Sequence, residues 1–219
     1  PESKLGKIGL AISPFDSSII YAAIETDRRN GGVYKTTNSG GSWVKMSDTV
    51  SGATGPHYYQ ELVASPHVFD KIYLMDTNVQ VSENGGKDFY MMNESDKHVD
   101  NHSLTFKMSD PNYLLIGTDG GIYESFDDTD SWKFVANLPL TQFYKLAVDD
   151  AYPFYNIYGG TQDNNTQGGP SRTLKRSGIT NSDWFVLLGG DGHQPATEPG
   201  NPNIVYAQSQ QGNIHRIDR

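Results

Sequence analysis

The sequence from Thr36 to Trp43, TTNSGGSW, occurs again as SENGGKDF from Ser82 to Phe89 and, with more changes, as SFDDTDSW from Ser125 to Trp132. The aromatic residues that end the three copies are 46 and then 43 residues apart. A phrase that returns at a nearly constant period of this size is the signature of a repeat architecture. The repeat therefore indicates the fold class before any single residue is interpreted.

Each repeat contains four short runs that are typical of β-strands. The first run ends at a proline corner, as at Ser13-Pro14 and Ser65-Pro66, and a second run such as 71–75 follows it. The third run leads into the repeated phrase, and the fourth begins at the aromatic residue of that phrase. β-Branched and aromatic residues favour strands, and no long segment keeps a helical period, so we predict an all-β chain. Four antiparallel strands in about 45 residues describe one blade of a β-propeller.

The whole chain, residues 1–219, is predicted to form a single β-propeller segment. We place four complete blades at about 8–46, 60–92, 102–135 and 143–186, and a partial fifth blade, without its last strand, at 190–219. Propellers usually close with four to eight blades, so we expect the chain to be a fragment of a larger propeller whose remaining blades are its partners. Open blade edges expose unpaired backbone groups, which predicts self-association of the isolated chain.

Composition excludes several classes of function. The formal net charge of −9 and the pI near 5.0 argue against binding to nucleic acid or to an anionic membrane surface. The sequence has no apolar run long enough to span a bilayer and no signal-peptide pattern. Cysteine is absent, so the chain has neither disulfides nor thiol chemistry, and the cellular compartment stays open on this evidence.

The repeated phrase falls between the third and fourth strands, where the chain needs a tight turn. Asn38 or Asp127 can bond back to the turn backbone, Gly40 and Gly41 tolerate positive φ, and the aromatic residue is expected to be buried between blades. The phrase resembles the Asp-box, or bacterial neuraminidase repeat, of sialidases, xyloglucanase-type glycosidases and sortilin-type receptors, where it lies away from the ligand. We therefore interpret the following residues as structural: Thr36, Asn38, Gly40, Trp43, Ser82, Asn84, Gly86, Phe89, Ser125, Asp127 and Trp132.

The third copy departs from this pattern. Thr129 stands where a glycine is expected, and Asp127, Asp128 and Asp130 offer oxygen ligands for calcium. The spacing lacks the glycine and the distal glutamate of a calcium loop, which favours a solvated turn.

The chain from Lys7 to Arg219 is similar to a large group of bacterial proteins usually labelled glycosyl hydrolase or sortilin-like. Five motifs carry this resemblance: 98–102 (HVDNH), 117–121 (GTDGG), 159–164 (GGTQDN), 189–192 (GGDG) and 205–213 (VYAQSQQGN). The resemblance implies a multi-blade propeller that is secreted or periplasmic. It implies a fold more firmly than a reaction.

His98, Asp100 and His102 alternate along the sequence just before the first strand of the third blade. On an extended segment, residues at i, i+2 and i+4 point to one side, toward the channel of a propeller. Imidazole and carboxylate groups in this pattern suit zinc or another divalent transition metal as a cofactor. The alternative is a hydrogen-bonded lining of the channel.

Polar residues beside glycines mark further candidates for chemistry or binding. Asp100, Asp119, Asp163 and Asp191 are candidate catalytic carboxylates, because glycoside hydrolysis needs two of them, although each is also an ordinary turn former. Phe143 and Tyr144 are interpreted as core residues. We expect these residues to contact a ligand at a mouth of the channel: Tyr58, Tyr59, Gln162, Asn164 and His193.

The preferred hypothesis is a non-catalytic module that binds carbohydrate or peptide at the channel mouth. A glycoside hydrolase module with paired aspartates is the first alternative, and a metal-dependent site at 98–102 is the second. Whether the chain is an enzyme stays open at this stage.

Overall fold

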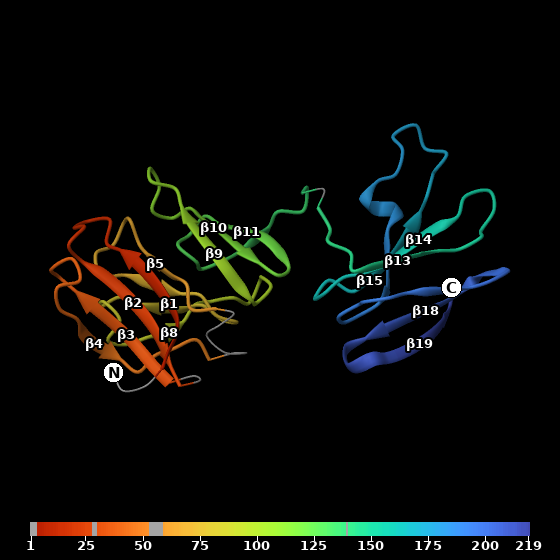
Figure 1. Ribbon diagram of the computed structural model, residues 1–219. Coiled ribbons are helices and arrows are strands. Elements are labelled where there is room, and N and C mark those ends of the chain that lie inside the picture. The colour runs from red at the N-terminus through yellow and green to blue at the C-terminus, as the bar shows by residue number, and fades with distance from the viewer. Residues whose placement is uncertain (1–3, 28–29, 53–58, 139) are drawn as a thin grey trace. The chain divides into compact units, whose positions relative to one another are not determined.

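The computed structural model describes residues 4–27, 30–52, 59–138 and 140–219, and it confirms the all-β propeller fold (Figure 1). Its described strands form five antiparallel sheets, of which the first four have four strands each and the fifth has three. Two short 3₁₀ helices are present, and the described residues contain no α-helix. None of the described helices could cross a lipid bilayer.

The chain divides into two compact units, residues 1–137 and 138–219. Unit 1 contains sheets 1 to 3. Sheet 1 is formed by β1 (Leu5–Ile12), β2 (Ile20–Thr26), β3 (Asn30–Thr36) and β4 (Val44–Ser47). Sheet 2 is formed by β5 (Leu62–Ala64), β6 (Ile72–Leu74), β7 (Gln80–Ser82) and β8 (Tyr90–Met91). Sheet 3 is formed by β9 (Asn101–Phe106), β10 (Leu114–Thr118), β11 (Gly121–Ser125) and β12 (Lys133–Phe134).

Unit 2 contains sheets 4 and 5. Sheet 4 is formed by β13 (Lys145–Val148), β14 (Asn156–Gly160), β15 (Thr166–Pro170) and β16 (Phe185–Leu188). Sheet 5 is formed by β17 (Ala196–Glu198), β18 (Asn201–Ser209) and β19 (Asn213–Asp218). The helix η1 (Asn181–Asp183) precedes β16, and η2 (Gln210–Gly212) precedes β19.

Successive sheets of unit 1 bury apolar residues between them. One core cluster joins sheet 1 to sheet 2 through residues such as Val33, Leu62 and Ile72. A second joins sheet 2 to sheet 3 through residues such as Val81 and Ile116. Inward and outward residues alternate along each strand, so sheet 2 uses one face for each cluster.

The three copies of the repeated phrase fold into the same hydrogen-bonded turn. In each copy a hydroxyl donates to the side chain two residues later, at 2.8 Å for Thr36 and Asn38, 3.0 Å for Ser82 and Asn84, and 2.9 Å for Ser125 and Asp127. The same Asn or Asp oxygen accepts a backbone N–H four residues later, from positions 42, 88 and 131. A side chain that replaces backbone partners in a turn is the reason why these positions carry Asn or Asp.

Asp127 uses both carboxylate oxygens within its own turn. Ser131 donates its backbone N–H to Oδ1 at 2.9 Å and its hydroxyl to Oδ2 at 2.6 Å. These bonds hold the pKa of Asp127 below its usual value. The turn thus satisfies this carboxylate with protein donors, as a solvated structural turn requires.

The aromatic residue of the phrase is buried only where a preceding sheet covers it. Trp132 of sheet 3 is 7% exposed and donates its indole N–H to the carbonyl of Asn93. Phe89 of sheet 2 packs on the core cluster between sheets 1 and 2. Trp43 of sheet 1 is 40% exposed, so the expectation of burial is wrong for this copy. The physical reason is that neither of the other two described sheets of unit 1 covers that face of sheet 1.

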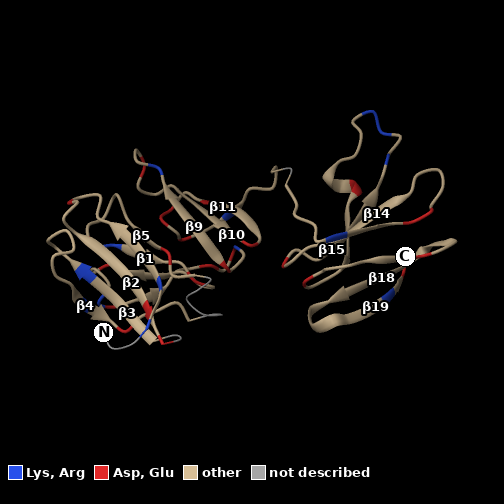
Figure 2. Ribbon diagram, viewed as in Figure 1, with Lys and Arg blue, Asp and Glu red and all other residues tan. Residues whose placement is uncertain are grey.

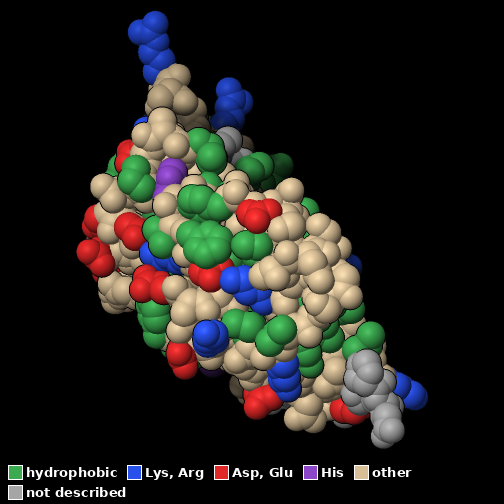
Figure 3. Space-filling view, turned by 90° about the vertical axis from the view of Figure 1, so that its left-hand side faces the viewer, with side chains coloured by type: hydrophobic (Ala, Val, Ile, Leu, Met, Phe, Trp, Pro, Cys, Tyr) green, Lys and Arg blue, Asp and Glu red, His purple; other side chains and the backbone are tan. Residues whose placement is uncertain are grey.

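The uncovered face of sheet 1 is apolar. Along β1, Ala11 is 8% exposed, whereas Leu10 and Ile12 are each 61% exposed. Sheet 4 shows the same pattern, with Leu146 60% and Val148 55% exposed. Figure 3 shows a side of unit 1 on which hydrophobic side chains lie among charged ones.

Antiparallel order gives each sheet two distinct ends. The first strand begins at the end where the second strand joins the third, which we call the site end. The opposite end holds the connections from first to second strand and from third to fourth, and we call it the turn end. The repeated turns lie at the turn end, so they are separated from the polar motifs that precede or follow strands at the site end.

Candidate functional site

Four polar side chains meet at the site end of unit 1. The hydroxyl of Tyr59 donates to Oδ1 of Asp100 at 2.6 Å, and Nε2 of His102 lies 2.8 Å from Oδ1 of Asp119. The rings of Tyr59 and His102 stack, with centroids 5.4 Å apart and planes 17° from parallel. We call Tyr59, Asp100, His102 and Asp119 the first cluster.

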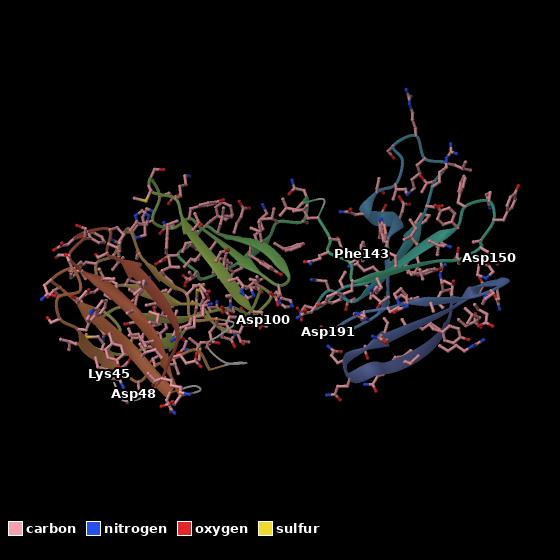
Figure 4. The ribbon with its side chains drawn as sticks, in the orientation of Figure 1. Lys45, Asp48, Asp100, Phe143, Asp150 and Asp191 are labelled. Carbon is pink, nitrogen blue, oxygen red and sulfur yellow. The ribbon has the colours of Figure 1, made fainter. Side chains whose placement is uncertain are left out.

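Backbone bonds between three loops place these residues. Tyr59 precedes β5, and Asp100 directly precedes β9. Asp100 donates its N–H to the carbonyl of Thr77 at 2.8 Å, and Asp119, in the turn between β10 and β11, donates its N–H to the carbonyl of Asp100 at 3.1 Å. Figure 4 shows Asp100 at the end of β9, where this strand begins.

The segment before β9 is fixed by a buried ion pair. Nζ of Lys97 lies 2.9 Å from Oε1 of Glu94, and these side chains are 0% and 4% exposed. The same ammonium group donates to Oδ1 of Asn101 at 2.5 Å and to the carbonyl of His98 at 3.1 Å. Burial lowers the pKa of Lys97, and Glu94 opposes this shift. A buried charge with three acceptors is satisfied, so the network holds the chain on both sides of His98 and Asp100.

A second buried carboxylate supports the loops beside the first cluster. Asp76 is 5% exposed and accepts hydrogen bonds from the hydroxyl of Ser51 at 2.9 Å, from the N–H of Gly52 at 2.8 Å and from Gln80 at 3.0 Å. Asp76 therefore links the segment after β4 to the β6–β7 connection. Its role is to position the loops rather than to meet a ligand.

The members of the first cluster differ in access to solvent. Tyr59 is 3% exposed, and burial followed by its bond to Asp100 raises the pKa of its phenol well above the usual range. The side chains of His102 and Asp119 are 36% and 23% exposed. A ligand would therefore reach the edge of the His102 ring and the Asp119 carboxylate, while Tyr59 supports the imidazole from behind.

The structure does not gather His98, Asp100 and His102 as three metal ligands. Within the described part of the chain, no group of three or more His, Asp or Glu side chains is arranged to hold a metal ion. Asp100 has a φ of 61°, so the segment is not extended and its alternate side chains do not share one side. Nδ1 of His98 instead lies 2.8 Å from the carbonyl of Val99.

Unit 2 contains a second cluster at its own site end. The hydroxyl of Tyr144 donates to Oε1 of Gln162, and the rings of Tyr144 and His193 lie 5.2 Å apart at 45°. The backbone N–H of Asp163 donates to Oδ1 of Asp191 at 2.8 Å. Asn164 belongs to the same turn, where its N–H donates to the carbonyl of Gln162 at 2.7 Å. We call these six residues, 144, 162–164, 191 and 193, the second cluster.

The candidate aspartates come together as two neighbouring pairs. Asp100 is next to Asp119 in unit 1, and Asp163 is next to Asp191 in unit 2. Each pair lies beside a contact between a tyrosine ring and a histidine ring. Tyr58 falls outside the described residues.

Sequence reasoning missed several residues that build these sites. Tyr144, interpreted as core, is 47% exposed and belongs to the second cluster. Asp76, Glu94, Lys97 and Asn101 were not singled out. A usable signal was their position, since Asp76 follows a second strand as Asp119 does, and Asn101 starts a first strand.

A cavity of about 600 Å³ lies on sheet 4, and its lining contains no residue of the second cluster. Its lining includes the rings of Phe143 and Trp184, whose planes are 24° from parallel. Phe143 covers Gly159 and Trp184 covers Gly169 so closely that a Cβ atom on these glycines would lie 2.3 Å and 2.6 Å from the rings. These glycines are on the apolar face that carries Leu146. The cavity therefore lies on the exposed apolar face of sheet 4 and not at its site end.

Comparison with known proteins identifies a fold but no family. No protein-family model matches the chain, and no curated protein matches it. Among solved structures it is similar to a GH74 enzyme of Niastella koreensis, with 13% identity and a TM-score of 0.50 over 92% of this chain and 33% of that one. At this identity the likeness shows the β-propeller fold alone.

Two further solved structures are similar at lower scores. A GH74 xyloglucanase from Xanthomonas campestris has 15% identity and a TM-score of 0.48 over 96% of this chain and 36% of that one. YCF48 from Cyanidioschyzon merolae has 12% identity and a TM-score of 0.43 over 99% of this chain and 67% of that one. The chain thus spans about a third of the length of the two GH74 proteins.

Proposed function

We propose that the chain is a ligand-binding propeller module that recognises a carbohydrate at its site end. The observation that carries this proposal is the His102 ring, which stacks on the ring of Tyr59 and bonds to the carboxylate of Asp119 while its side chain is 36% exposed. A sugar presents hydroxyl groups that bond to carboxylates and imidazoles and an apolar ring face that packs on aromatic rings. The second cluster repeats this chemistry with Tyr144, His193 and Gln162.

The test is a glycan array followed by titration calorimetry with the whole chain. His102→Ala and His193→Ala are expected to weaken binding of the selected glycan at least about tenfold. His67→Ala is the matched control, because His67 lies between β5 and β6 at the turn end and contacts the carbonyl of Lys107. Binding that all three variants retain, or binding only of peptides on a parallel array, would contradict the carbohydrate proposal.

Glycoside hydrolysis is a second candidate because the structure pairs the aspartates. The backbone N–H of Asp119 bonds to the carbonyl of Asp100, and that of Asp163 bonds to Oδ1 of Asp191, so each of these aspartates has a second one beside it. Glycoside hydrolysis uses two carboxylates that flank the scissile bond. A panel of 4-nitrophenyl glycosides tests it. Release of nitrophenol that Asp119→Asn or Asp191→Asn abolishes would establish hydrolysis, and no release from any glycoside would leave the binding module.

We also propose that another four-stranded propeller sheet covers the apolar face of sheet 1. Leu10, Ile12 and Trp43 are exposed there, whereas the equivalent faces inside unit 1 are buried by the preceding sheet. The chain has no cysteine, so a single Leu10→Cys substitution can be labelled selectively. Its maleimide labelling should be slower in the full-length parent protein than in the isolated chain, whereas Leu174→Cys, 92% exposed, should label rapidly in both. Equal rates at position 10 would refute the covering sheet.

The identical hydrogen bonds in three turns support membership of the Asp-box propellers, and with it a secreted or periplasmic location. The full-length parent should contain further copies of the turn about every 45 residues and an export signal. A parent without additional copies would contradict the assignment, and retention in the cytoplasm on cell fractionation would contradict the location.

A further inference from the structure

Two loops of unit 2 form one surface at the turn end of sheet 4. Residues 149–155 connect β13 to β14, and residues 171–184 connect β15 to β16. The N–H of Ser171 donates to the carbonyl of Tyr155 at 2.8 Å, and the guanidinium of Arg172 lies 5.7 Å from the ring centre of Phe154. We call these two segments the double-loop surface.

The double-loop surface is remote from the second cluster. In Figure 4, Asp150 of the first loop and Asp191 of the second cluster lie at opposite ends of unit 2. The antiparallel order of the strands agrees with this placement. β13 and β15 run in the same direction, so the two loops that follow them both lie at the turn end, opposite the second cluster. Any role of this surface is therefore independent of ligand binding at the site end.

The longer loop is held in a defined shape by its own polar residues. Asp183 accepts from the N–H of Thr180 at 2.8 Å and from its hydroxyl at 2.9 Å, and it also pairs with the ammonium of Lys175. The N–H of Gly178 closes a turn on the carbonyl of Lys175 at 3.0 Å. Lys175 and then the bonds from Thr180 lower the pKa of Asp183 to about 2, so this carboxylate stays charged at neutral pH.

This ordered surface exposes large apolar side chains. Tyr152 is 97% exposed and Leu174 is 92% exposed, and Tyr155 and Ile179 are 48% and 42% exposed. Exposure of several large apolar groups on loops with fixed backbone contacts is a pattern of binding surfaces rather than of solvated loops. Tyrosine, arginine and aliphatic anchors are also the residue types that supply affinity at protein interfaces.

The charge of the longer loop is opposite to that of the chain. Arg172, Lys175 and Arg176 outnumber the single carboxylate of Asp183 in residues 171–184, whereas the chain has a net charge of −9. Figure 2 shows this basic segment at the projecting loop of unit 2. In the other loop Asp149 is buried, and the exposed Asp150 accepts from the N–H of Gly200 at 2.9 Å. The basic side chains lie on the longer loop, so this loop favours the acidic groups of a partner.

We propose that the double-loop surface binds a peptide segment of a partner protein in which carboxylates flank an aliphatic or aromatic side chain. Leu174 of the longer loop supplies the contact for the apolar side chain, Tyr152 of the other loop offers a second apolar contact, and Arg176 attracts the carboxylates. Complementary charge of this kind increases the association rate and selects the partner, while the apolar anchors supply the affinity.

The test is selection of a random 12-residue phage-displayed peptide library on the whole chain, followed by fluorescence anisotropy with the synthetic consensus peptide. Wild type should select acidic sequences with an apolar residue. Leu174→Ser and Arg176→Glu should each raise the Kd of that peptide at least about tenfold. Met108→Ser, 72% exposed, and Lys87→Glu, also exposed, lie in unit 1 and are matched controls that should leave the Kd unchanged. Unfolding in urea should be the same for all four variants, because the positions are exposed.

Three results would overturn the proposal. The first is no enrichment of the library over a surface without protein, and the second is a selected peptide that binds Leu174→Ser and Arg176→Glu as tightly as wild type. Binding of the chain only to vesicles that contain phosphatidylserine would assign the surface to a lipid instead. Failure of the glycan experiments at the site end would leave each of these outcomes unaffected.

Discussion

Replacing Thr129 by glycine is expected to stabilise unit 1. Thr129 has a φ of 80° in the third repeated turn, at the position that Gly40 and Gly86 occupy in the other two copies with φ of 89° and 93°. A β-branched residue is rarely found in this region, because its Cβ approaches the backbone too closely. The hydroxyl of Ser125 accepts the N–H of residue 129 at 3.0 Å, a bond that glycine retains.

The size of the effect follows from two opposing contributions. Relief of the left-handed backbone strain is worth roughly 1–2 kcal/mol. The greater freedom of glycine in the unfolded chain costs about 0.4–1 kcal/mol. A net increase of roughly 0.5–1 kcal/mol in the free energy of unfolding is therefore expected, which corresponds to an increase of a few degrees in Tm.

Two reverse substitutions complete a graded series. Gly40→Ala introduces strain without a clash, because the nearest atoms to its Cβ are in the Trp43 ring at 3.9 Å, so it should cost about 1 kcal/mol. Gly86→Ala adds a clash, because its Cβ would lie 2.6 Å from Cγ1 of Val33, and should cost about 1–3 kcal/mol more.

Urea unfolding followed by tryptophan fluorescence measures the series, and Trp132 at the end of the third turn reports locally. The expected order of stability is Thr129→Gly, wild type, Gly40→Ala and Gly86→Ala. A Thr129→Gly protein that is less stable than wild type would refute the reasoning, since it would mean that the threonine side chain contributes more than the strain costs.

Three other predictions concern buried charge, a buried phenol and an open edge. Lys97→Met should lower the free energy of unfolding by about 3–5 kcal/mol, because Glu94 is left buried without its ion-pair partner. The double variant with Glu94→Gln should recover part of this loss, and urea unfolding measures both proteins. Burial and then the bond to Asp149 raise the pKa of Tyr158 from 10.0 to about 12. The contribution of this phenol to stability is therefore complete below pH 10 and is lost as the pH rises toward 12. Tyr158→Phe should lack this loss, and equal pH dependence of the free energy of unfolding in both proteins would contradict the assignment. The chain is expected to self-associate through the edge strand β19, and Ile214→Lys should reduce the mass measured by light scattering; a wild-type monomer would count against the open edge.

The architecture could be predicted from the sequence because the same pattern of strands and turn occurs in several copies. Each copy combines a turn residue whose side chain replaces backbone partners with strands of alternating polarity, so local preference and global fold agree. The described sheets confirm four four-stranded sheets and a fifth without its last strand. The exposure of Trp43 was not predictable in this way, because burial depends on a neighbouring sheet and not on the turn itself.

The composition of the sites was less predictable, because it depends on contacts between loops that are far apart in the sequence. Tyr59 precedes the first strand of sheet 2 and His102 lies in the first strand of sheet 3, and only the folded chain stacks their rings. The alternation of His98, Asp100 and His102 predicted a shared direction, and one residue with positive φ was enough to remove it. Side-chain period is informative only while the backbone stays extended, and glycine-rich polar motifs are the segments in which it does not.

The supporting residues of the first cluster show why its chemistry is hard to derive from residue types. Asp76 and Glu94 are carboxylates in loops at the site end, as Asp100 and Asp119 are, yet they are buried and bonded to backbone, hydroxyl, amide or ammonium donors. Asp119 differs from them because it is partly exposed and holds an imidazole. An aspartate beside a glycine is therefore not enough to identify a ligand-binding residue. Its hydrogen-bond partners and its exposure to solvent decide whether it can contact a ligand or only positions the loop.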